Sequence, residues 1–138
     1  MKYLPLYTEA QLSSVEQVET LAINKSCMLC PLFEHCKHPC LSPEGSEETG
    51  GLLIIGDHPL VADDVRNRPF SSTLGAKLRT IIRRYWKGPV YLDYAIKCAP
   101  RKGKKVTDTQ ISLCRHYLAK TIAETKPARV ITLGSIAM

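Results

Sequence analysis

Six cysteines are the residues of this sequence best suited to carry chemistry. Cys27 and Cys30 are separated by two residues, a spacing that lets two thiolates bind one metal centre. Cys98 and Cys114 come much later, on either side of a predicted strand-to-helix loop that can bring them together. Four thiolates from two distant segments suit a 4Fe–4S cluster, with zinc as the alternative. The competing interpretation is that the thiols are buried apolar side chains.

Cys36 and Cys40 allow a second arrangement. With Cys27 and Cys30 they make a compact local set of four thiols, which is typical of a structural zinc site. That arrangement would describe a zinc-stabilised interaction domain. In a reducing compartment, thiols of this kind are seldom joined in structural disulfides.

Length and composition indicate one folded, soluble domain of 138 residues, with 44% apolar and 23% charged side chains. No apolar run approaches the roughly 20 residues that cross a bilayer. The first residues show no secretory signal, so we expect a cytoplasmic protein with no membrane partner. The formal net charge of +6 suits a polyanionic partner, most commonly nucleic acid, but charge alone favours a merely solvated basic surface.

The periodicity of apolar residues predicts alternating strands and helices. Capping boxes begin two helices, at Thr8 and at Thr107. We predict helices over 8–23, 73–86 and 107–125, strands over 52–56, 90–96 and 129–134, and loops over 31–50 and 57–72.

This order of elements predicts an α/β fold in which helices cover both faces of a central parallel sheet, a three-layer α/β/α sandwich. We expect a lead-in helix over 1–26 and one domain over 27–138. The third strand lies close to Met138, and an apolar strand at a sheet edge is poorly protected. We therefore expect that the domain lacks its last strand and that a further helix and strand follow Met138; a partner that covers the edge is the alternative.

Several stretches follow the paired cysteines in a recognisable order. They are Gly56-Asp57-His58-Pro59-Leu60, Asp63-Asp64, Asn67-Arg68-Pro69-Phe70-Ser71-Ser72, Val90-Tyr91-Leu92-Asp93-Tyr94-Ala95-Ile96-Lys97-Cys98-Ala99-Pro100 and Leu133-Gly134-Ser135-Ile136-Ala137. From Cys27 to the end, this pattern resembles the iron–sulfur uracil-DNA glycosylases, families 4 and 5 of their superfamily. The match in order and spacing is far longer than a single short motif.

The resemblance implies roles for individual residues. Cys27, Cys30, Cys98 and Cys114 would be the ligands of a 4Fe–4S cluster. Phe70 would be the aromatic platform on which a base extruded from DNA stacks, although an ordinary core phenylalanine is the alternative. Asp57 follows a strand end that faces the ligand crevice, where it would hold a water or stabilise positive charge on the sugar.

The chain departs from the family pattern at site positions. His58, a potential acid or base, stands where the family has a small residue. Tyr94 stands where the family has the asparagine that reads the polar edge of uracil, and a phenol cannot offer the amide's donor and acceptor together. The family's late His-Pro-Ser loop has no counterpart before Met138.

A basic loop of Arg101, Lys102, Lys104 and Lys105 is predicted to contact DNA phosphates without reading sequence. We expect single-stranded or uracil-containing DNA as the partner, with a replication or repair protein as a further partner. The first hypothesis is an N-glycosylase that excises uracil or another altered base in DNA repair. The second is a catalytically degenerate iron–sulfur module that binds DNA or a protein partner.

Overall fold

The computed structural model describes residue 27 and residues 29–138, so the helix predicted over 8–23 lies outside the described residues. The elements are a 3-10 helix η1 (Pro31–His35), strands β1 (Glu44–Gly45), β2 (Leu52–Gly56), β3 (Val90–Tyr94) and β4 (Arg129–Leu133), and helices α2 (Val61–Arg66), α3 (Thr73–Tyr85) and α4 (Asp108–Thr125). The predicted core strands and helices are therefore confirmed within one or two residues at most boundaries.

The four strands form one sheet in the order β1-β3-β2-β4. β2 lies at the centre and pairs in parallel with β3 and with β4. β1 is antiparallel to β3, with Glu44 opposite Leu92. The sheet is parallel as predicted, except for this short first strand.

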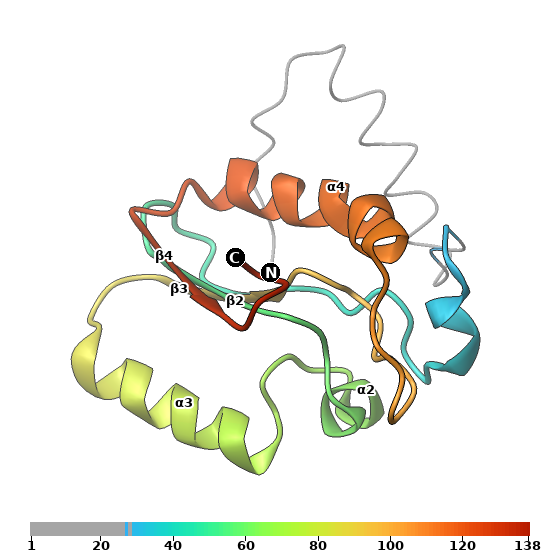
Figure 1. The fold of residues 1–138 in the computed structure, drawn as a ribbon. Helices are drawn as coiled ribbons and strands as arrows, with labels where there is room; N and C mark the ends of the chain where they lie inside the picture. The colour runs from blue at the N-terminus through green and yellow to red at the C-terminus, as the bar shows by residue number, and fades with distance from the viewer. Residues whose placement is uncertain (1–26, 28) are drawn as a thin grey trace.

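Helices cover the two faces of the sheet, which confirms the predicted three-layer α/β/α sandwich. α4 lies on one face, and α3 with α2 lies on the other (Figure 1). Because successive side chains of a strand point to opposite faces, the continuous apolar run of β2 supplies both cores. One core joins Leu52, Ile54, Leu92 and Ile82, and the other joins Leu53, Ile55, Tyr91 and Ala95.

Two short elements lie in segments that were predicted to be loops. α2 lies within 57–72, and η1 and β1 lie within 31–50. A helix of six residues has too few turns to show a hydrophobic period. β1 has only two residues, so its pairing with β3 sets its conformation.

β4 and α3 differ from the sequence expectation in burial. The apolar run 129–134 was predicted to be a buried strand, but every residue of β4 is exposed, with Ile131 at 45%. On α3, Ile82 is buried, whereas Leu74 is 73% and Tyr85 is 74% exposed. β4 is the edge strand of the sheet and pairs only with β2. Among the described residues, no strand lies beyond β4, and its side chains and those of Leu74 and Tyr85 on α3 stay exposed.

None of the helices in the described part of the chain is long and apolar enough to span a membrane.

Candidate base site, thiol cluster and basic loop

The candidate base site lies where the parallel strands end. Gly56, the last residue of β2, is in register with Tyr94 of β3 and with Leu133 of β4. The loops that leave these strands carry the predicted site residues. This is the edge of a parallel sheet at which ligand crevices form.

Phe70 and Tyr94 stack on each other at this edge. Their ring centroids are 4.7 Å apart and their planes are inclined by 21°. Gly56 makes room for the stack, because a Cβ there would lie 2.8 Å from the Tyr94 ring and 2.9 Å from Phe70. Phe70 itself has a positive φ of 48°, an uncommon backbone conformation for a bulky side chain. The loop is therefore built to place this ring against Tyr94.

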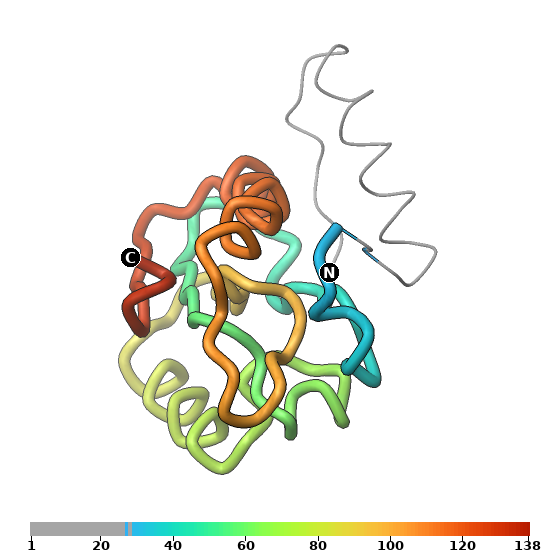
Figure 2. Tube along the Cα trace, turned by 45° about the vertical axis from the view of Figure 1, so that its right-hand side comes forward, coloured from blue at the N-terminus to red at the C-terminus, as the bar shows by residue number. Residues whose placement is uncertain are grey.

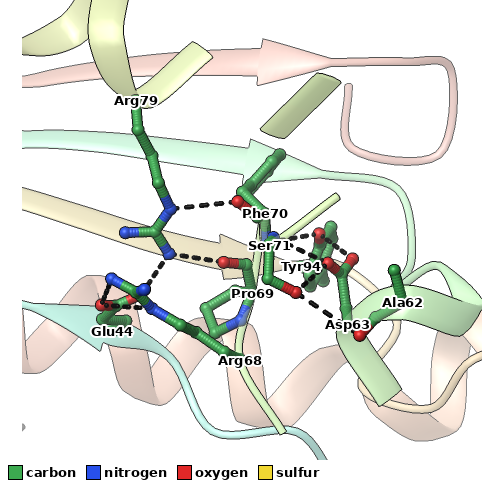
Figure 3. A network of polar contacts seen from close by, with 9 residues as sticks. All are labelled: Glu44, Ala62, Asp63, Arg68, Pro69, Phe70, Ser71, Arg79 and Tyr94. Carbon is green, nitrogen blue, oxygen red and sulfur yellow. Dashed lines mark hydrogen bonds and ion pairs between the residues drawn. The ribbon is translucent and has the colours of Figure 1, made fainter. Parts of the chain in front are cut away.

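Asp63 holds the stack in place (Figure 3). Its side chain is fully buried (0% exposed), and both carboxylate oxygens accept hydrogen bonds. Oδ2 accepts from the Tyr94 hydroxyl at 2.6 Å and from the Leu60 amide at 2.9 Å. Oδ1 accepts from the Ser71 amide at 2.8 Å and from the Ser71 hydroxyl at 3.0 Å. One carboxylate thus joins α2, the Phe70 loop and the end of β3.

These contacts shift two pKa values in opposite directions. Burial alone raises the pKa of Asp63, but the hydrogen bonds from Tyr94, Leu60 and Ser71 outweigh it and lower the pKa below its usual range. Burial and the hydrogen bond to Asp63 raise the pKa of Tyr94 well above its usual range. Asp63 is therefore held as a carboxylate and Tyr94 as a neutral phenol.

Arg79 fixes the backbone on the other side of Phe70. From α3, its guanidinium donates to the carbonyl of Phe70 at 3.0 Å and also to the carbonyl of Pro69. It forms an ion pair with Glu44 of β1, which Arg68 also contacts, at 2.9 Å. Sequence reasoning did not assign roles to Arg79 and Glu44. The signal available was an arginine nine residues after Phe70, on the helix that the loop enters.

Asp57 and His58, the predicted catalytic pair, directly follow β2. Asp57 Oδ1 accepts hydrogen bonds from the amides of Ile136 and Ala137, at 2.9 and 2.8 Å, so it caps the turn after β4. The Nδ1 atom of His58 lies 3.0 Å from the carbonyl oxygen of Pro59. Neither residue is part of the Phe70–Tyr94 hydrogen-bond network, and their catalytic role stays a prediction.

The segment of the early cysteines lies against the loop that carries Cys98, because the Cys40 amide donates to the Cys98 sulfur at 3.3 Å. Burial is the largest cause that raises the pKa of Cys30, and the nearby Cys98 and Cys27 raise it further. Burial likewise raises the pKa of Cys114, and Cys98 adds to that rise. The segment that carries Cys30 lies beside the loop that follows β3 (Figure 1 and Figure 2). Cys36 connects the two segments directly, because its thiol donates to the carbonyl of Ala99 at 3.3 Å.

All six cysteines are free thiols. Burial raises the pKa of Cys40 to about 11 and that of Cys114 to about 12. For Cys98, the hydrogen bond with Cys36 is the largest cause and burial the next, and together they raise its pKa still further. Such thiols stay protonated at neutral pH unless a cation stabilises the thiolate.

The chemistry of this donor set fits a thiolate-bound metal centre. Two sulfur atoms accept backbone hydrogen bonds, Cys98 from the amide of Cys40 at 3.3 Å and Cys114 from the amide of Lys97 at 3.4 Å. Amides directed at sulfur are a known means of tuning iron–sulfur centres. Over residue 27 and residues 29–138, however, no three His, Cys, Asp or Glu side chains are already arranged to hold a metal ion. The thiols share one region without forming a closed ligand set.

The predicted basic loop is exposed throughout. Arg101, Lys102, Lys104 and Lys105 all lie in the segment between β3 and α4, which follows Cys98. A second group of exposed basic side chains, Lys77, Arg83 and Arg84, lies on α3. Both groups are exposed to solvent, and only the first adjoins the thiols.

Comparisons with known proteins agree with this arrangement. Residues 43–138 match the family model of the uracil DNA glycosylase superfamily. A type-4 uracil-DNA glycosylase of Pyrobaculum aerophilum is 31% identical, over 81% of this chain and 57% of that protein. One of Thermotoga maritima is 25% identical over 96% of this chain and 67% of that protein, and one of Saccharolobus solfataricus is 26% identical over 80% and 51%.

The chain thus spans about half to two thirds of the length of these curated relatives. The family match covers more than half of this chain and includes β2, the Phe70 loop, β3 and β4. The chain therefore belongs to the uracil DNA glycosylase superfamily, with type-4 enzymes among its relatives.

Proposed function

We propose that this chain is a DNA-binding repair protein of the uracil-DNA glycosylase type that carries a 4Fe–4S cluster. The observation that carries the proposal is the contact of the segment that holds Cys36 and Cys40 with Cys98 and Ala99, at the start of an exposed basic loop. The named activity of the type-4 relatives supports DNA as the substrate class.

Cys27, Cys30, Cys98 and Cys114 would hold the cluster. When bound, it would supply a fixed cross-link from the N-terminal segment, which provides Cys27 and Cys30, to the loop after β3, which provides Cys98, and to α4, which provides Cys114. Cys36 and Cys40 would then lie close to the ligand Cys98, with the Cys36 thiol and the Cys40 amide hydrogen-bonded to its sulfur. Zinc on the same thiols is the alternative metal.

The basic loop would bind the DNA backbone. Arg101, Lys102, Lys104 and Lys105 are exposed, and they belong to the loop that carries Cys98 at its start. Phosphate contacts by such residues give affinity that depends on salt and little on sequence. We propose single-stranded or uracil-containing DNA as the ligand, with a replication or repair protein as a further partner.

If the chain excises a base, Phe70 would stack on that base, and Asp57 or His58 would act on the sugar or the leaving base. The position of these residues at the carboxyl edge of the sheet supports that role. A second candidate function, a DNA-binding or partner-binding module without glycosylase activity, is favoured by two observations. Tyr94 already covers Phe70, and Asp57 already caps the turn after β4.

Iron and sulfide analysis of anaerobically purified protein tests the cluster. We expect iron and sulfide with the visible absorption of a thiolate-bound cluster, and loss of both in Cys98→Ser and in Cys114→Ser. Cys36→Ser is the matched control and should retain the cluster. Zinc in place of iron would refute the iron–sulfur assignment and favour the zinc alternative.

DNA binding and base excision are measured separately. Fluorescence anisotropy with single-stranded DNA should show binding that weakens as salt rises. Release of free uracil from a uracil-containing strand would establish the enzyme, whereas binding without release would establish the second candidate. Absence of salt-dependent DNA binding would refute the proposed function itself.

A further inference from the structure

Tyr94 covers the ring that the proposed function assigns to base stacking. Its centroid lies 4.7 Å from that of Phe70 in a stacked geometry, the arrangement in which aromatic rings and bases bind each other. Phe70 also packs against the core of Leu52, Ile54, Ile82 and Leu92. Its ring is therefore engaged with the core and with Tyr94, and a base cannot take the place of Tyr94 while that side chain stays where it is.

The polar end of Tyr94 also makes the contacts that the edge of a base makes. Its oxygen accepts a hydrogen bond from the amide of Phe70 at 3.0 Å, and its hydroxyl donates to Asp63 at 2.6 Å. A base edge likewise offers acceptors and donors side by side in the plane of a flat ring. Tyr94 thus satisfies a half-buried backbone donor and a fully buried carboxylate, the two groups that the edge of a base in its place would contact.

The surroundings oppose removal of the ring. Tyr94 is 4% exposed and is the last residue of β3, held in register with Gly56. Gly56 already lies so close to both rings that even a Cβ would collide with them. Rotation of Tyr94 away from Phe70 would leave Asp63 and the Phe70 amide each short of one hydrogen bond, which is costly for buried groups. The arrangement in which Tyr94 stacks on Phe70 is therefore the stable one.

We propose that Tyr94 is a specificity-determining residue that fills the base position over Phe70, so that the chain binds DNA without accepting an extruded uracil there. The inference rests on the proposed function in assigning DNA as the ligand. It goes further in stating that a single side chain, that of Tyr94, excludes an extruded base from the position over Phe70. Removal of that side chain should open the position to a base.

The test compares two single-stranded oligonucleotides that differ at one central position, uracil in one and an abasic analogue in the other. Anisotropy titrations with the full chain should give a dissociation-constant ratio near one for the wild type. For Tyr94→Ala, the uracil strand should bind more tightly by about 5- to 150-fold, the range that base–aromatic stacking supports. Tyr94→Phe is the matched control: it keeps the ring, loses the hydroxyl, and should retain a ratio near one.

A second measurement does not depend on DNA binding. Ligand-observed NMR with free uracil should show contact with Tyr94→Ala and none with the wild type or Tyr94→Phe. A wild type that prefers the uracil strand by 5-fold or more would overturn the inference, and this result needs no variant to fold. A folded Tyr94→Ala protein that binds both strands equally and takes up no free uracil would also overturn it, while leaving DNA binding intact. Uptake of free uracil by Tyr94→Ala, in a chain that binds neither strand, would support the inference and refute the proposed function.

Discussion

Replacement of Asp63 by asparagine should destabilise the domain by about 3 kcal/mol, more than any surface substitution would. Asp63 is fully buried and accepts four hydrogen bonds, two on each carboxylate oxygen. Asparagine has nearly the same shape but only one acceptor oxygen, since its other end is an amide that donates. The substitution therefore changes the hydrogen bonding and leaves the packing unchanged.

The magnitude follows from the geometry of the four donors. One oxygen faces the amide of Leu60 and the other faces the amide of Ser71, so either orientation of asparagine points its NH₂ group at a backbone N–H. A buried donor left unsatisfied costs roughly 1–3 kcal/mol, and hydrogen bonds to a neutral acceptor are weaker than those to a charged one by about 1 kcal/mol. Together these effects give the expected loss of about 3 kcal/mol, or roughly 10 °C in the melting temperature of a domain of this size.

Urea unfolding followed by circular dichroism measures the loss. The matched control is Asp108→Asn, the same chemical change at an exposed position in the first turn of α4, which should cost no more than about 1 kcal/mol. If the free energy of unfolding of Asp63→Asn lay within 1 kcal/mol of the wild type, the four hydrogen bonds would not stabilise the loop as argued.

Three further predictions use the same fold. Because the folded-state pKa of Asp63 is lowered, the ionised side chain stabilises the fold fully above the unfolded pKa, near 3.9, and this contribution is lost as pH falls through the lower folded value. Over that pH window, acid unfolding should therefore reduce the free energy of unfolding less in Asp63→Asn than in the wild type. Simultaneous replacement of the four basic loop residues by glutamine should reduce the slope of log affinity against log salt by about 0.7 per lost phosphate contact on single-stranded DNA. These residues are Arg101, Lys102, Lys104 and Lys105. The control Lys87→Gln, at an exposed position just after α3, should leave the slope unchanged. Thr107→Ala removes the side chain that accepts from the Gln110 amide at 3.2 Å, and should lower the free energy of unfolding by about 1 kcal/mol in urea titration; an unchanged value would show that the capping box does not stabilise α4.

Local signals in the sequence were enough to predict the main elements. The apolar run of β2 and the capping box at Thr107 each specify one structure over a few residues, and both predictions are confirmed. The burial of β4 was predicted wrongly for a physical reason. A run such as Val130-Ile131-Thr132-Leu133 shows that a strand can be buried, but only the neighbouring layers decide whether it is.

The sequence was enough to predict which residues belong to the candidate site, but not the contacts that they make with one another. Phe70 and Tyr94 were both singled out, yet the stack between them depends on a positive φ at Phe70 and on the absence of a side chain at Gly56. Asp63 appeared only as half of an acidic pair. Its four hydrogen bonds come from residues up to 31 positions away, and no local pattern encodes such a convergence.

The pairing of β1 with β3 has a consequence for the order in which the domain assembles. The thiol-bearing segment is tied to the rest by contacts between distant residues, Glu44 with Leu92 and the Leu41 amide with the Lys97 carbonyl at 2.7 Å. Closing so long a loop loses chain entropy, which is recovered only after β3 has formed. The early and late cysteines should therefore meet only once β3 is in place, and their thiols should stay open to alkylating reagents until β1 has paired with it.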